Sequence, residues 1–202
     1  MVAFIDILTS QLFALGFIGF IILYITLNSF WSYKQGKKDN LNIPSGFLPL
    51  ATLGVYIFIT GLFGQFTWPL PGNYNILFYD IYPLVGLLFI SFAWSLKSGL
   101  NLQHVGFFAM MLGMMTIFYG YEGYALGLTT IPIALLGLYT LFGIAGILGY
   151  PITVMLDRAK AGVKNKSMLW IILVLAFSAF LILGSLTAIA IAAAAIPEHL
   201  AS

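Results

Sequence analysis

Two carboxylates occupy positions in long apolar stretches of this sequence. Asp80 lies within ILFYDIYPLVG, and Glu122 lies within TIFYGYEGYALGLTT. A carboxylate in the hydrocarbon of a membrane is costly unless it is solvated, paired or protonated, so acids in such segments are candidates for function. We interpret Asp80 as a cation or proton site, or as a polar lining residue of a water-filled entrance. The alternatives are an interfacial residue that reaches the lipid headgroups and a group that ties two helices together.

Glu122 has comparable alternatives. Gly120 and Gly123 beside it would allow another helix or a solute to approach the backbone closely. If Glu122 shared a vestibule with Asp80, repulsion and loss of solvent would favour protonation of one acid, giving an acid sensor or a proton acceptor. Otherwise Glu122 is a solvated acid at a helix end. The candidate pathway for a solute or ion consists of both acids with their tyrosine and amide neighbours: Asp80, Glu122, Tyr79, Tyr82, Tyr119, Tyr121 and Gln65.

The residue types argue against several other kinds of site. The chain has no cysteine, which excludes disulfides and thiolate ligands for zinc or iron–sulfur clusters. His104 and His199 fall on opposite sides of the expected membrane region, so one haem cannot bind both in a monomer. The methionine pairs in FFAMMLGMMT are expected to pack rather than to hold copper. No hydrolase triad, phosphate loop or zinc motif is recognisable. We expect no cofactor, no metal and no enzymatic activity.

These side chains must be positioned by elements that cross a membrane. Of 202 residues, 61% are hydrophobic and 7% are charged, whereas roughly a quarter are charged in a soluble domain. Six apolar segments are each long enough for a transmembrane helix, which takes roughly 20 residues. Their approximate ranges are 4–30, 44–66, 75–96, 102–122, 131–154 and 168–196. We predict an all-α, polytopic membrane protein with a single six-helix transmembrane domain over residues 1–202. Pro83 is expected to kink the third helix near Asp80.

The basic residues fall after the first, third and fifth segments. The eight of them are Lys34, Lys37, Lys38, Lys97, Arg158, Lys160, Lys164 and Lys166. The loops around 67–74 and 123–130 have no Lys or Arg. By the positive-inside rule, the basic loops are cytoplasmic and both termini lie outside the plasma membrane. The outer side then receives Asp6, Asp80, Glu122 and Glu198, and the inner side receives Asp39 and Asp157 beside basic neighbours.

Six short-looped helices with both termini outside resemble the proton-gated urea and amide channel family. The stretch FYDIYPLVGLLF, residues 78–89, is similar to an aromatic and glycine-leucine segment of those channels. The resemblance implies an oligomer in which each protomer carries a narrow, aromatic-lined pore for small neutral solutes. The outer histidines associated with acid gating have no evident equivalents. The chain also resembles the uncharacterised six-span membrane proteins of archaea and bacteria.

Two functions remain open from the sequence. The first is a channel or transporter-like conduit for a small solute or cation, with an acidic outer vestibule. Aromatic walls favour neutral solutes and the acidic outer face favours cations, so the sequence does not choose between them. The alternative is a cofactor-free accessory or structural subunit of a larger membrane complex, such as a respiratory assembly. Partners are therefore the lipid bilayer, further copies of the chain or other membrane subunits, and no nucleic acid.

Overall fold

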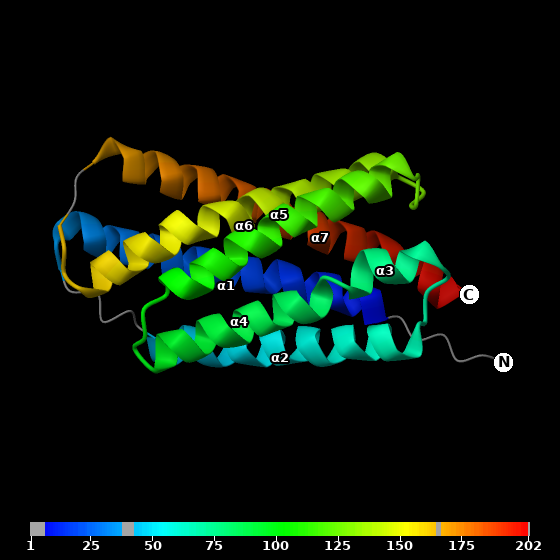
Figure 1. Ribbon diagram of the computed structural model, residues 1–202, viewed down its shortest axis with the longest axis horizontal. Coiled ribbons are helices and arrows are strands. Elements are labelled where there is room, and N and C mark those ends of the chain that lie inside the picture. The colour runs from blue at the N-terminus through cyan, green and yellow to red at the C-terminus, as the bar shows by residue number, and fades with distance from the viewer. Residues whose placement is uncertain (1–6, 38–42, 165–166, 202) are drawn as a thin grey trace.

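The described chain is a bundle of helices along one long axis (Figure 1). The computed structural model describes residues 7–37, 43–164 and 167–201, and no strand occurs within them. Asp6, Lys38, Asp39 and Lys166 lie outside the described residues, as do the side chains of Glu198 and His199. The helices are α1 (Ile7–Gln35), α2 (Ile43–Thr67), α3 (Asn73–Tyr79), α4 (Tyr82–Lys97), α5 (Gln103–Ala125), α6 (Pro132–Lys160) and α7 (Met168–Ala201).

The predicted all-α membrane architecture is confirmed. Six stretches of helix are long and apolar enough to cross a membrane, and α3 with α4 together form the third of them. The observed helices run past the predicted ends at the basic loops, for example to Gln35 in α1 and to Lys160 in α6. Hydropathy marks only the part of a helix that lies in hydrocarbon, so a polar last turn is missed.

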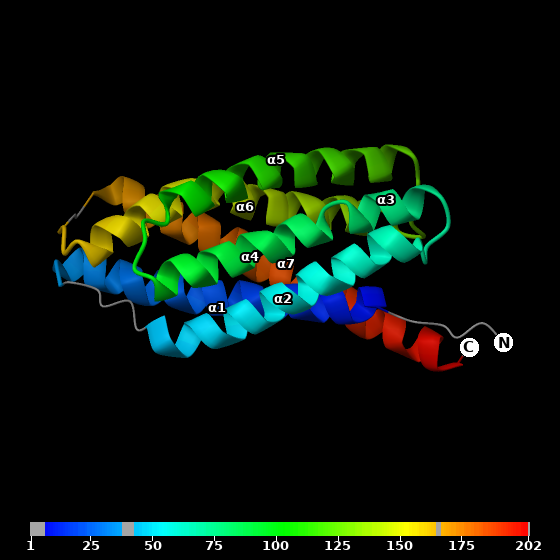
Figure 2. The same cartoon turned by 60° about the horizontal axis from the view of Figure 1, so that its bottom comes forward.

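The bundle is built from three closely packed helix pairs: α5 with α6, α2 with α4, and α1 with α7 (Figures 1 and 2). Helices in lipid approach through small residues, because apolar burial gives little net attraction there. Gly113 of α5 illustrates this, since a Cβ at that position would lie 2.5 Å from the carbonyl oxygen of Gly143 and 2.9 Å from the nitrogen of Ile147. In contrast, α4 and α5 contact each other little, although they are consecutive in the chain.

The two ends of the bundle differ in charge. The loops after α1, α4 and α6 lie at one end, and the last turns of these helices carry Lys34, Lys97, Arg158 and Lys160 (Figure 1). We call this the basic end. The start of α1, the end of α7 and the loops that follow α2 and α5 lie at the other end, here called the opposite end (Figure 1).

Candidate functional site

The third membrane span is interrupted at Asp80. Helix α3 ends at Tyr79 and α4 begins at Tyr82, although Asn73–Lys97 has the length and hydropathy of one continuous span. Pro83 lies in the first turn of α4 and has no N–H to donate to the Tyr79 carbonyl. The expected disturbance near Pro83 is confirmed: the regular helical hydrogen bonding is interrupted at Asp80 and Ile81, although both residues keep right-handed helical dihedrals. Interrupted membrane helices form solute and ion sites in many transporters.

Helix α2 fits closely against the interruption because it presents glycines there. A Cβ at Gly61 would stand 2.7 Å from the nitrogen of Pro83, and one at Gly64 would overlap the ring of Tyr79. Asn75 of α3 strengthens this contact, since its Nδ2 donates a hydrogen bond of 3.1 Å to the Gly64 carbonyl. The interruption is therefore held in place from the α2 side.

Tyr139 of α6 holds the interruption from the other side. Its buried hydroxyl donates a hydrogen bond of 2.8 Å to the carbonyl of Leu77, one turn before the helix restarts. A carbonyl at such a break needs a donor inside a membrane, because water does not supply one. The ring of Tyr139 also meets Phe78 edge to face, with 6.5 Å between centroids. Sequence reasoning missed Tyr139, and its signal was a tyrosine within a largely apolar span.

Asp80 and Tyr119 meet across the gap between the third and fourth spans. The hydroxyl of Tyr119, on α5, donates a hydrogen bond of 2.9 Å to Oδ2 of Asp80, and both residues are half-buried. No Lys, Arg or His among the described residues forms an ion pair with Asp80. A tyrosine supplies one neutral donor, so the remaining lone pairs of this carboxylate are open to a proton, a cation or a polar solute.

The other predicted pathway residues do not gather around this pair. Tyr79 and Tyr82 are buried in the bundle, whereas Tyr121 is 58% exposed and faces away from it. Glu122 is exposed and Gln65 is half-buried. The structure records no side-chain hydrogen bond of Glu122 or Gln65 with another described residue. Asp80 and Tyr119 therefore form the polar centre of the candidate site.

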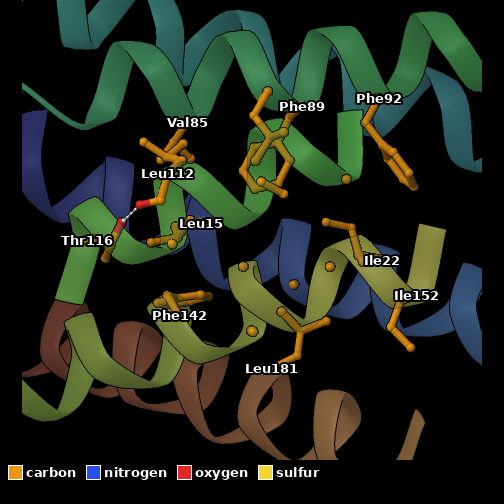
Figure 3. A pocket seen from close by; sticks show the side chains of 18 of the residues that line it. Leu15, Ile22, Val85, Phe89, Phe92, Leu112, Thr116, Phe142, Ile152 and Leu181 are labelled. Carbon is orange, nitrogen blue, oxygen red and sulfur yellow. Dashed lines mark hydrogen bonds between the residues drawn. The ribbon is translucent and has the colours of Figure 1, made fainter. Parts of the chain in front are cut away.

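A cavity of about 160 Å³ lies in the middle of the bundle beside this pair. Its walls come from α1, α3, α4, α5, α6 and α7 and are almost entirely apolar (Figure 3). Representative lining residues are Leu15, Val85, Phe89, Leu112, Phe142 and Leu181. No Asp, Glu, Lys, Arg, His, Asn or Gln is among the described residues that line it. The weak contact between α4 and α5 leaves this space open inside the bundle.

Asp80 and Tyr119 do not line the cavity themselves but adjoin residues at one of its ends. Phe78 and Ile81, on either side of Asp80 in the sequence, both line it. Thr116 also lines it, one helical turn before Tyr119 on α5. The hydrogen bond between Asp80 and Tyr119 therefore joins the third and fourth spans beside the cavity, on the side of the cavity toward the opposite end of the bundle.

Asp157 marks the basic end of the cavity. It follows the lining residue Leu156 in α6, and its carboxylate accepts hydrogen bonds from the backbone N–H groups of Leu102 and Gln103 at 2.9–3.1 Å. Lys160 donates from Nζ to the carbonyl of Gly99 in the same turn. The link between α4 and α5 is thus attached to α6. Sequence reasoning placed Asp157 at this end but assigned it no role, because its partners lie more than 50 residues away in the chain.

Among the described residues, no cluster of three or more His, Cys, Asp or Glu side chains is placed to hold a metal ion. The polar groups at the interruption are the Asp80 carboxylate, the hydroxyls of Tyr119 and Tyr139, the Asn75 amide and backbone carbonyls.

The comparisons with known proteins name no activity. No curated protein and no solved structure matches the chain. One family model, described as a protein of unknown function (DUF981), matches residues 1–202. The expected resemblance to an uncharacterised membrane family is confirmed, and no match links the chain to urea channels. Because the match covers the full sequence, this six-span membrane protein belongs to the DUF981 family.

Proposed function

We propose that the chain is a conduit for a small neutral solute, with the Asp80–Tyr119 pair as its closure at the opposite end of the bundle. The observation that carries this proposal is the interruption of a membrane span at a carboxylate, next to residues that line a cavity inside the bundle. An unbroken helix would bury apolar surface more simply. An interruption leaves backbone groups that need other partners in a membrane, which is costly. A role in solute passage explains why the chain keeps Pro83, Gly61 and Tyr139 at this interruption.

The chemistry of the cavity supports a neutral solute in preference to a permanently charged ion. A cation in this space would lose its hydration, and the described lining offers no carboxylate and no ring of carbonyls to replace it. The sequence left neutral solutes and cations as equal alternatives. The apolar lining favours the neutral class for passage and leaves the Asp80 carboxyl group at the mouth.

The orientation in the cell is part of the same proposal. Basic residues at the ends of α1, α4 and α6 favour the basic end as cytoplasmic. The chain is then a multi-pass protein of the plasma membrane with both termini outside, and Asp80 faces the exterior. We further propose a homo-oligomer in which each protomer carries its own conduit.

One surface favours the alternative, an accessory subunit of a larger membrane complex. Exposed Phe107, Met111, Met114, Met115 and Phe118 lie along α5, and methionine-rich faces adapt easily to partners. Native nanodisc purification followed by mass spectrometry separates the two functions. A conduit is recovered as copies of this chain alone, and unrelated membrane chains in constant ratio would favour the subunit.

The conduit is tested by solute uptake into vesicles that contain the purified protein. Urea, formamide and glycerol are presented in a stopped-flow light-scattering assay, with empty vesicles as the baseline. Tyr119→Phe removes the donor to Asp80 and should raise the uptake of the accepted solute severalfold by loosening the closure. Tyr24→Phe, at a tyrosine that is 68% exposed on α1, should behave as wild type. Uptake equal to that of empty vesicles for every variant, with these solutes and with methylamine as a further small solute, would overturn the proposal.

A further inference from the structure

The site combines two features that select opposite kinds of solute. At one end, the Asp80 carboxylate has a single described hydrogen-bond donor and no described cationic partner, which suits a positively charged group. Beyond it lies a cavity with apolar walls, which suits an uncharged molecule. A solute that is a cation in water and becomes neutral by losing one proton satisfies both features.

The cavity offers little to a solute that must keep several hydrogen bonds. Three hydroxyls in its wall already donate to backbone carbonyls at 2.8 Å: Thr116 to Leu112, Thr153 to Tyr150 and Tyr139 to Leu77. The buried hydroxyl of Thr26 has no hydrogen-bond partner among the described residues. Burying an amide without hydrogen-bond partners is unfavourable. Urea and its relatives are therefore poor candidates, and a molecule with one small polar atom is a better one.

The groups around Asp80 do not compete with a bound cation. The titratable side chains that the structure places at the interruption are the tyrosines Tyr79, Tyr82, Tyr119 and Tyr139, and α2 contributes Gly61 and Gly64 there. The other titratable residues of α4, α5 and α6, apart from exposed tyrosines and Glu122, lie toward the basic end: Lys97, His104, Asp157, Arg158 and Lys160. The exposed acid Glu122 adds negative charge on α5. Aromatic rings and carboxylates both attract ammonium groups.

We propose that the conduit takes ammonia or a small primary amine, which Asp80 collects as the ammonium ion and which crosses the cavity as the free base. The inference rests on the proposed function, because it names the solute class of that conduit. At Asp80 one N–H bond of the ammonium breaks, its electron pair stays on nitrogen, and an O–H bond forms on the carboxylate. The proton then returns from Asp80 to water at the mouth, so no net charge crosses the membrane. A cavity of about 160 Å³ has room for such molecules, since an engineered apolar cavity of roughly 150 Å³ binds benzene.

The experiment uses vesicles that contain the purified full chain and a trapped pH-sensitive dye. Entry of a free base raises the internal pH, whereas entry of the ammonium ion generates a potential without that rise. Methylammonium is added outside over a series of pH values. The lipid leak falls roughly tenfold for each pH unit below the pKa of the amine, because the free base becomes scarce. The protein-dependent alkalinisation should fall less steeply, since Asp80 collects the abundant cation.

Asp80→Asn is the decisive variant. The asparagine oxygen still accepts from Tyr119, so the closure persists, while the charge and the proton acceptor are lost. In Asp80→Asn, the protein-dependent alkalinisation should fall with decreasing pH as steeply as the lipid leak does. Tyr24→Phe should retain the shallower pH dependence of the wild type. Equal alkalinisation by wild type and Asp80→Asn would overturn the inference, as would a potential without alkalinisation.

The same vesicles separate this inference from the proposed function. Protein-dependent uptake of formamide or glycerol, with methylammonium entry no faster than in empty vesicles, would leave the conduit standing and overturn the amine assignment. If neither the neutral solutes nor methylammonium enter faster than in empty vesicles, both proposals fail.

Discussion

Asp157, near the end of α6, accepts a bifurcated hydrogen bond from the backbone N–H of Leu102, 55 residues earlier in the chain. The same carboxylate accepts from Gln103, the first residue of α5. The first N–H groups of a helix have no partners within it, and an acid there also meets the positive end of the helix dipole. In most helices this cap comes from an adjacent residue. Here it comes from another span and fixes the α4–α5 turn to α6.

Removal of this cap should weaken the bundle. Asp157→Ala leaves the N–H groups of Leu102 and Gln103 without their acceptor, and we expect a loss of about 1–2 kcal/mol in unfolding free energy. Asp157→Asn should lose less, because one oxygen can still accept. The measurement is the unfolding midpoint in mixed micelles. Glu122→Gln, at an exposed acid without a described side-chain hydrogen bond, should leave the midpoint unchanged. An equal fall of the midpoint in Asp157→Ala and Glu122→Gln would contradict the capping role.

The hydroxyl of Tyr139 should stabilise the interruption in the third span. Tyr139→Phe removes the donor to the Leu77 carbonyl, and leaving a buried carbonyl without a partner costs about 1–3 kcal/mol. Amide hydrogen exchange in Asn73–Tyr79 should accelerate in this variant. Tyr150→Phe, on the same helix at an exposed tyrosine whose hydroxyl has no described hydrogen bond, is the matched control. Unchanged exchange after Tyr139→Phe would show that the interruption does not depend on this bond.

Two glycines of the α5–α6 pair should respond in opposite ways to the same substitution. A Cβ at Gly113 would lie 2.5 Å from the carbonyl oxygen of Gly143, a backbone atom that has little freedom to move. Gly113→Ala should therefore separate the helices and lower the unfolding midpoint. At Gly137 of α6 no atom lies within 4 Å of the added Cβ, so Gly137→Ala should be neutral or stabilise by up to about 1 kcal/mol. Equal effects in unfolding assays would contradict the close packing at Gly113.

Cysteine labelling should reveal the orientation of the bundle. The chain has no cysteine, so a single introduced cysteine is the only cysteine that the reagent can label in each variant. Ser98→Cys at the basic end and Thr130→Cys at the opposite end both replace exposed residues. We expect a membrane-impermeant maleimide to label Thr130→Cys in intact cells and to label Ser98→Cys only after the membrane is opened. The reverse pattern would place Asp80 toward the cytoplasm and remove the proposed outer entrance.

The fold was predictable from the sequence because each span carries its own signal. Hydropathy reports the solvent around a segment, and in a membrane that solvent dictates a helix. The disturbance near Pro83 was predictable for a similar reason, since the missing N–H is a property of one residue. The basic end was also predictable, because Lys34, Lys97 and Arg158 follow alternate apolar segments, the first, third and fifth.

The pairing of side chains between spans was not predictable. Asp80 and Tyr119 were both recognised as candidate residues, but their hydrogen bond depends on the rotation and depth of two helices 39 residues apart. Nearly uniform apolar surfaces do not encode that rotation, because lipid and protein neighbours are equally apolar. The contacts that set it are close approaches at glycines such as Gly64 against Tyr79. The same limit explains why Glu122 was grouped with Asp80, although it is exposed and shares no described hydrogen bond with it.

Filling the cavity should block the conduit without disturbing its mouth. Val85 of α4 projects into the cavity (Figure 3), whereas Leu87 of the same helix is 38% exposed on the outer surface. Val85→Phe should reduce the protein-dependent uptake of methylamine to the level of empty vesicles, and Leu87→Phe should retain it. Overpacking costs typically about 1–3 kcal/mol, so the elution volume and helical content of each variant are compared with wild type. Ala145→Val is a milder filling variant at another lining position and should give a partial reduction. Full uptake by folded Val85→Phe would show that the solute does not pass through this cavity.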